Sequence, residues 1–474
     1  MSASEQLAVL AGQSRDALFG FDPVSGTQAG WHEYDGRLPD LTDHAVDEHV
    51  RALDALLERI DAVDDLDLAV DEQVDLEVLR ARLAAEAFDL SEISRHRWDP
   101  LTWDPSGGLH ALAIRDFAPP SERLRSAHER LGAVPGFLAD ARQTLREMSA
   151  IHVETALLRL DGFDAVLDEL APLGTLDSAL VDRAREAVET HQAWLAERLP
   201  ASRRDPRLGV RLYSAALWHH LDEELAPVQV LEMAEAHLDD VNARMREVAA
   251  EYLGETVRSP DVVRRALADA ADRAYVDRDT VVPTIRHALD RATRFVRDHD
   301  LLTLPDQPVD VGDMPRIHRG VAVAYCDAPG PLEEASLRTF VAVAPPPKDW
   351  APERVQSFLR EYNGDLLHDL AIHEAMPGHV VQLARARAAD TSLVRRLAPS
   401  GVFIEGWAVY AEELLADRGY APDDAPRAHL RLRLQQLKMQ ARATLNAILD
   451  ARVHGGDIDE VAAIELLRRR GFQE

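Results

Sequence analysis

The sequence predicts a mainly α-helical protein with a small β-sheet next to its most informative motif. Amphipathic stripes recur from the N-terminus to about residue 300, and each places its apolar residues on one helix face. A representative stripe consists of Val46, Val50, Leu53, Leu57 and Ile60. Two segments, 319–329 and 337–347, break the pattern with Val, Ala, Phe and Tyr between Pro and Gly signals, and they predict strands. Helical patterns resume after Asp349.

Clusters of Pro, Gly and Asp mark where the helices end. These breaks fall at residues 98–120, 170–175, 199–207, 258–261 and 304–315. We expect a helical region over 1–310 that forms one wall of a cleft, and a second region over 311–474 that carries the sheet and the chemistry. Residues 339–345 form a candidate edge strand that could pair with an extended peptide, although an ordinary buried strand fits them equally.

Composition excludes several classes of partner. The 474 residues hold 53 Lys and Arg against 83 Asp and Glu, and the net charge of −30 repels nucleic acid and anionic membrane surfaces. Cys326 is the only cysteine, so no intrachain disulfide can form, as is usual in a reducing compartment. We find neither a signal-peptide pattern nor an apolar run of the roughly 20 residues that span a bilayer. The sequence therefore predicts a cytoplasmic protein without nucleic-acid or membrane partners, and it leaves the oligomeric state open.

The stretch "HEAMPGH", residues 373–379, carries the strongest chemical signal. In H-E-x-x-H, two histidines four residues apart share one helix face and can bind one zinc ion. His373 and His379 are six residues apart, which in a straight helix separates them by about 120° and about 9 Å along the axis. Pro377 and Gly378, however, are the residues most able to interrupt a helix. We expect a distortion at Met376–Gly378 that returns His379 to the face of His373.

Several acidic residues can complete such a site. Glu374 is placed to accept a proton from a metal-bound water, and Glu405 is the best candidate for a third ligand. Glu412 shares the helical face of Glu405, so it is either a residue that supports a ligand or the ligand itself. Asp369 precedes His373 by four residues and could fix its tautomer, although a surface carboxylate fits Asp369 equally.

A later pair, Asp450 and His454, lies one helical turn apart in "DARVH". The pair could present an imidazole to a developing oxyanion. The alternative is a histidine at a helix C-terminus before Gly455, where it interacts favourably with the helix dipole, and spacing alone favours this alternative.

Together these residues resemble a large bacterial family of unknown function. That family is recognised by H-E-x-x-P-G-H followed by E-G-W-A-x-Y-x-E, which read here as "HEAMPGH" (373–379) and "EGWAVYAE" (405–412), and by a later D-x-x-x-H that "DARVH" (450–454) matches. The motif order is similar to that of glutamate-ligand (gluzincin-type) zinc peptidases, especially helical ones such as carboxypeptidase Taq, the thimet-type oligopeptidases and angiotensin-converting enzyme.

The resemblance implies a helical, cleft-bearing fold with a small sheet beside the active site. It also implies Zn²⁺ ligands at His373, His379 and Glu405, a general base at Glu374, and transition-state or substrate contacts from His454 and Tyr410.

We therefore expect a zinc-dependent hydrolase of peptide or similar amide bonds, an exopeptidase or dipeptidase that acts on short peptides. A hydrolase of a non-peptide amide or of an ester fits the same motif, because the motif specifies the water and not the acyl group. From another class, the chain could be a helical binding or scaffold protein that keeps a vestigial metal site. Structural zinc sites are usually closed and richer in cysteine, which favours the catalytic kind.

Overall fold

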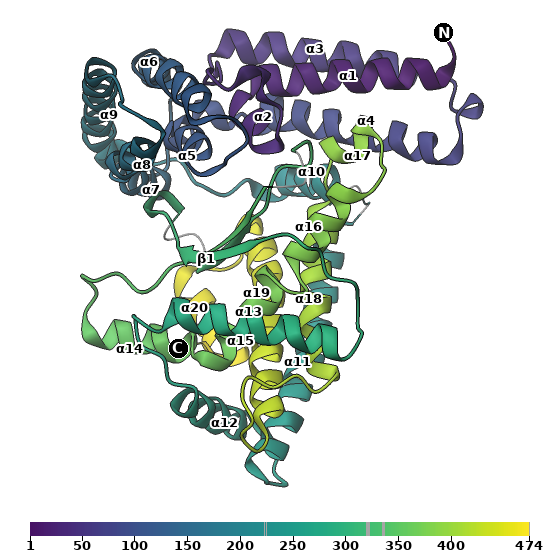
Figure 1. The fold of residues 1–474 in the computed structure, drawn as a ribbon, viewed down its shortest axis with the longest axis vertical. Coiled ribbons are helices and arrows are strands. Elements are labelled where there is room, and N and C mark those ends of the chain that lie inside the picture. Colours follow the sequence, from purple (N-terminus) through teal and green to yellow (C-terminus); the bar gives the residue numbers. More distant parts are fainter. Residues whose placement is uncertain (222, 224, 319–322, 334–336, 474) are drawn as a thin grey trace.

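Helices build nearly the whole molecule, shown as a computed structural model in Figure 1. The structure describes residues 1–474 except 222, 224, 319–322, 334–336 and 474. The predicted mainly α fold with one small sheet is confirmed. Among the described helices, none combines the length and the apolar character that crossing a membrane requires.

The first part of the chain forms two helical groups, at the top of Figure 1. Its helices are α1 Ala3–Phe21, α2 Pro23–Ala29, α3 Asp43–Asp61, α4 Val70–Phe88, α5 Ser106–Ile114, α6 Pro120–Thr144, α7 Ala150–Leu160, α8 Phe163–Leu170 and α9 Ser178–Arg198. The long helices α1, α3 and α4 bury one apolar core, which includes Leu53 and Leu83. Helices α5 to α9 bury a second core around Leu131 and Leu170. The apolar helix faces predicted from the sequence pattern pack into these two cores.

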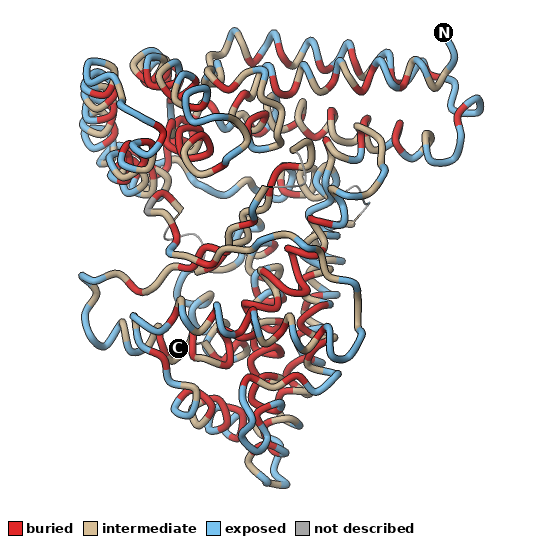
Figure 2. Tube along the Cα trace, in the orientation of Figure 1, coloured by how far each residue is buried: buried red, intermediate tan, exposed pale blue. Residues whose placement is uncertain are grey.

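The second part carries the sheet and the remaining helices. Its helices are α10 Gly209–Leu221, α11 Pro227–Leu253, α12 Pro260–Arg273, α13 Val281–Asp298, α14 Pro352–Glu361, α15 Gly364–Glu374, α16 His379–Ala388, α17 Leu393–Leu397, α18 Gly401–Asp417, α19 Ala428–Gly455 and α20 Glu460–Arg470. Figure 2 shows buried residues gathered at its centre, around α15, α18 and α19. The boundary predicted at residue 311 does not follow the packing, because α11 packs on α19 and α13 packs on α15.

Three strands, β1 Val309–Asp313, β2 Ala324–Asp327 and β3 Thr339–Val343, form the sheet in the order β1-β3-β2. β3 runs parallel to β1 and antiparallel to β2. The predicted strands correspond to β2 and β3, although residues 319–322 of the first prediction lie outside the described residues. The interpretation of 339–345 as an edge strand is wrong, because β1 and β2 occupy both hydrogen-bonding edges of β3. β1 lies in a segment that we interpreted as a helix break.

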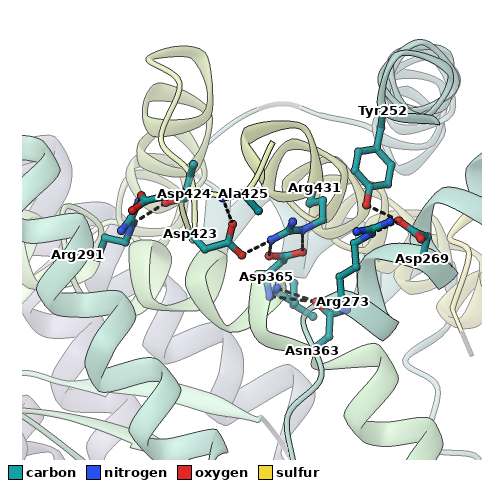
Figure 3. A network of polar contacts seen from close by, with 12 residues as sticks. Tyr252, Asp269, Arg273, Arg291, Asn363, Asp365, Asp423, Asp424, Ala425 and Arg431 are labelled. Atoms are coloured by element: carbon teal, nitrogen blue, oxygen red, sulfur yellow. Dashed lines mark hydrogen bonds and ion pairs between the residues drawn. The ribbon is translucent and has the colours of Figure 1, made fainter. Parts of the chain in front are cut away.

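Buried charges fix the N-terminal end of α15 (Figure 3). Asn363 caps this helix by accepting the backbone N–H groups of Asp365 and Leu366. The Asp365 carboxylate accepts a 2.9 Å hydrogen bond from the Arg431 guanidinium at the start of α19, and both side chains are buried. Arg431 also pairs with Asp423 at 2.5 Å. Paired, hydrogen-bonded charges are the form in which ionic groups tolerate burial, so this network sets where α15 begins relative to α19.

Removing the Arg431 charge is expected to be strongly destabilising. Arg431→Met leaves the Asp365 carboxylate buried without its cation, which costs about 3–5 kcal/mol of unfolding free energy. The double variant Asp365→Asn/Arg431→Met should regain part of that loss. Chemical denaturation of the three proteins measures it, with Arg265→Met as a control, since the Arg265–Glu255 pair is exposed to solvent and its loss should change stability far less. Equal losses for Arg431→Met and Arg265→Met would contradict the assignment.

His32 joins the first part of the chain to the loop that follows β2. Its Nδ1 lies 3.0 Å from Asp35 and its Nε2 lies 3.1 Å from Glu333, while the Leu332 N–H donates to the Ala29 carbonyl. Burial opposes the charged imidazole, but the hydrogen bonds to both carboxylates prevail and raise the pKa of His32 to about 9. A histidine whose pKa is raised on folding stabilises the fold fully below its unfolded pKa of 6.5, and this stabilisation is lost as the pH rises through about 9.

The junction should therefore weaken in alkali. Between pH 7 and pH 10 the wild type is expected to lose about 1 kcal/mol more than His32→Gln, after allowance for solvent screening of this partly exposed pair. Thermal melts across that pH range measure the difference. His44→Gln, at an exposed histidine of α3, is the control and should melt with the wild-type pH profile. If His32→Gln keeps the wild-type pH profile of melting as well, the contacts of His32 with Asp35 and Glu333 do not stabilise this junction.

Candidate metal centre

The helix interruption lies where the Pro-Gly pair predicted it. α15 ends at Glu374 and α16 begins at His379. Between them the Met376 N–H donates to the Ala371 carbonyl and the Gly378 N–H to the Ile372 carbonyl, steps of five and six residues that a regular α-helix does not make. The peptide bond between Met376 and Pro377 is cis. The predicted interruption between Met376 and Gly378 is thus confirmed.

Gly378 is required by how closely the chain folds back on itself. A Cβ at this position would lie 1.9 Å from the His373 carbonyl oxygen and 2.4 Å from that of Ile372. No side chain fits against backbone at that distance, so the turn depends on glycine. The indole Nε1 of Trp407 donates to the Pro377 carbonyl at 2.9 Å and fastens the turn to α18.

This turn brings together His373, His379 and Glu405. Each offers one ligand atom, and these atoms all lie within 4.8 Å of one another. The His373 Nε2 is 3.4 Å and the His379 Nε2 is 3.8 Å from the nearest Glu405 oxygen. A tetrahedral zinc ion with bonds of about 2.0–2.1 Å holds its ligand atoms about 3.4 Å apart. Two imidazoles and one carboxylate at this spacing can therefore hold a divalent cation.

Glu412, and not Asp369, orients His373. The Glu412 carboxylate lies 2.6 Å from Nδ1 of His373, which directs Nε2 toward Glu405. Asp369 is buried, and its Oδ1 has no hydrogen-bond partner among the described residues. The prediction that Asp369 fixes the tautomer is therefore wrong. Burial, together with the neighbouring Glu412, raises the pKa of Asp369 and favours a neutral carboxyl group there.

The electrostatics of the cluster favour a positive charge within it. Burial disfavours a charged His373, but the hydrogen bonds that its ring donates to Glu405 and Glu412 outweigh burial and raise the pKa of His373 to about 11. Burial, followed by repulsion from His373, lowers the pKa of His379 to about 4. Without a metal, His373 is therefore the imidazole of the pair that carries a positive charge. A cation that binds there replaces the proton that gives His373 this charge, as metal binding to imidazole generally does.

Glu374 lies beside the cluster and belongs to the same helix end. One of its oxygens is 4.0 Å from the His379 Nε2, and its carboxylate accepts the backbone N–H of Cys326 in β2. Burial is the main cause that raises the pKa of Glu374 to about 7. A carboxylate that titrates near neutral pH suits a group that both accepts and returns a proton. The contact from β2 also puts the sheet next to the site.

Neither His454 nor Tyr410 contacts the cluster among the described residues. His454 accepts the Leu208 N–H at Nδ1, and its ring stacks on Tyr213 with centroids 5.1 Å apart. Asp450 accepts from the Tyr213 hydroxyl at 2.9 Å and lies 3.6 Å from the His454 Nε2. These contacts hold α10 against the C-terminal end of α19. Tyr410 is exposed and packs against Trp407.

The sequence did not predict the contributions of Trp407 and Cys326 to the site. Trp407 lies inside the quoted "EGWAVYAE" motif, and an indole within an otherwise exposed helical turn is a signal that could have suggested a fastening role. The contribution of Cys326 comes from its backbone N–H, which every residue except proline carries, so no side-chain pattern could have revealed it.

The model of a family described as "Bacterial protein of unknown function (DUF885)" matches residues 23–474. The chain belongs to the DUF885 family. No curated protein matches this DUF885 chain.

Solved structures share the DUF885 fold seen here. A "putative lipoprotein of unknown function" from Shewanella oneidensis is 26% identical, with a TM-score of 0.76 over 99% of this chain and 87% of that one. A "putative lipoprotein" from Colwellia psychrerythraea, 16% identical, gives the same TM-score and the same two coverages of 99% and 87%. The second likeness concerns the fold alone.

The turn at Gly378 yields a matched pair of glycine variants. Gly378→Ala is expected to displace His379 and weaken zinc binding at least about tenfold, because its Cβ meets two backbone carbonyls. Gly406→Ala, next to Glu405 in α18, has open space around the new methyl group and should bind zinc as the wild type does. Calorimetric zinc titration of both variants measures this. Equal affinities for the two variants would show that the close approach at Gly378 does not position the ligands.

Proposed function

We propose that this DUF885 protein is a zinc-dependent hydrolase of peptide or similar amide bonds. The observation that carries the proposal is the convergence of His373, His379 and Glu405 with Glu374 beside them. Three protein ligands of this type leave one position for water or substrate, which is the arrangement of catalytic zinc and not of structural zinc. The exposed Glu405 side chain gives that position access to solvent.

The protein's own groups have separable roles in this reaction. His373, His379 and Glu405 would hold the ion, and Glu412 keeps the His373 Nε2 aimed at it through the 2.6 Å contact with Nδ1. When bound, zinc supplies a water of lowered pKa and polarises the carbonyl that is attacked. Glu374 would accept a proton from the attacking water and return it to the leaving amine. The Cys326 N–H bond orients the Glu374 carboxylate for this transfer.

Short peptides are the proposed substrates, and exopeptidase or dipeptidase action is the proposed mode. The chemistry serves a non-peptide amide or an ester equally well, since Glu374 and the candidate ligands would act on the water and the carbonyl group that all these substrates share. His454 and Tyr410 have no role in this proposal, because the described contacts of His454 are with Leu208 and Tyr213, and Tyr410 packs against Trp407.

Metal content and hydrolysis together test the proposal. The purified protein, reconstituted with zinc, should bind about one ion, and chelation should abolish hydrolysis of a library of di- and tripeptides, amides and esters. Glu374→Gln should retain the zinc and lose about 10²–10⁴-fold in rate, because it removes the general base and no ligand. His379→Ala should lose the metal.

Glu353→Gln, at an exposed glutamate of α14, is the control and should keep both zinc and activity. A wild type that holds no zinc after reconstitution contradicts the metal centre. A zinc-loaded wild type that hydrolyses nothing in the library, or a Glu374→Gln variant as active as the wild type, contradicts the catalytic role.

A further inference from the structure

A cavity of about 550 Å³ opens beside the metal centre, between the first part of the chain and the sheet. Its wall from the first part includes His110 of α5, Arg115 directly after α5 and Arg159 of α7, and its opposite wall includes Tyr325 and Cys326 of β2. We propose that this cavity is a carboxylate-binding subsite that receives an anionic group of the substrate. The inference rests on the proposed function and goes beyond it by naming what the substrate must carry.

Arg159 supplies the positive charge. Two arginines line the cavity, but Arg115 is neutralised by Asp327 and also donates to the Ala328 carbonyl at 2.7 Å. Arg159 forms no ion pair with any described carboxylate, and its buried Nε has no hydrogen-bond partner among the described residues. The chain has a net charge of −30, yet Arg159 has no counter-ion among the described residues. Its positive charge at the cavity wall therefore favours binding of an anion there. The planar guanidinium matches a carboxylate with two parallel hydrogen bonds.

The neighbouring rings add polar groups around the same space. His110 holds Glu169 through Nδ1 at 2.5 Å, and its buried Nε2 has no partner among the described residues. His318 lies edge-on to both His110 and Tyr325, each with centroids 5.3 Å apart. Burial is the main cause that raises the pKa of Tyr325, so its hydroxyl stays protonated and able to donate. Burial is also the main cause that lowers the pKa of His318 and favours its neutral ring.

The cavity adjoins the reacting centre through two residues. Cys326 lines the cavity, and its backbone N–H binds Glu374. Leu383 also lines the cavity and lies one turn after His379 in α16. A peptide held at His373, His379 and Glu405 therefore extends into the cavity on one side. In a short peptide the carboxylate is either the C-terminus or the side chain of Asp or Glu, and both present the same chemistry to Arg159.

Binding to zinc-loaded Glu374→Gln tests the subsite without turnover. The probes for calorimetry are acetyl-Ala-Ala-Ala with a free carboxylate, its C-terminal amide, and the amide of acetyl-Ala-Glu-Ala. The free acid should bind at least about tenfold more tightly than the uncharged amide. Adding Arg159→Gln should remove that advantage and leave the affinity of the uncharged amide unchanged. Arg159→Lys should restore part of it, because it restores the charge without the planar fork.

Arg183→Gln is the matched control, since Arg183 is an exposed arginine of α9 in the same part of the chain. It should bind all three probes as the parent does. If the Glu-containing amide binds as tightly as the free acid and its affinity also depends on Arg159, the subsite is supported and recognises an acidic side chain. If the free acid and both amides bind alike, or if Arg159→Gln weakens all three equally, the subsite is overturned. These results compare affinities within zinc-loaded protein, whereas the zinc content and hydrolytic activity of the wild type decide the proposed function.

Discussion

The contact between Gly378 and the carbonyl groups of Ile372 and His373 is the constraint on which the candidate site depends. It lets one helix end and another begin within five residues, so that a histidine at the end of α15 and a histidine at the start of α16 face the same point. Any Cβ at residue 378 would open this turn. The bond from Trp407 to Pro377 then adds α18, and with it Glu405, to the same assembly.

Burial gives this turn its rigidity and its charge balance. α15 is held at its N-terminal end by Asp365 and Arg431, and at its C-terminal end by the contact of His373 with Glu412. Both anchors are ionic pairs removed from water, where a missing partner is costly, so each tolerates little displacement. Of the three candidate ligands, Glu405 has the most exposed side chain.

Local sequence patterns predicted those features whose causes are local. The Pro-Gly pair in "HEAMPGH" interrupts the helix at its own position, and the amphipathic stripes directly indicate the helices in which they lie. Asp369 and Glu412 could not be ranked in advance, because Asp369 lies one turn from His373, Glu412 lies two turns from Glu405, and only tertiary packing decides which one meets His373. The position of β3 at the centre of the sheet depends on β1, whose Pro- and Gly-rich surroundings resemble a loop. The cavity at Arg159 is assembled from residues more than a hundred positions apart, which no local pattern contains.

The residues that would perform the chemistry and one wall of the cavity come from different stretches of the chain. The candidate ligands and Glu374 lie between residues 373 and 405, whereas the cavity wall with His110, Arg115 and Arg159 precedes residue 161. Mutations in the early helices can therefore alter the cavity without touching the turn at Gly378. Within one family, selection could diversify the recognised molecule in one half of the gene while conserving the reaction in the other.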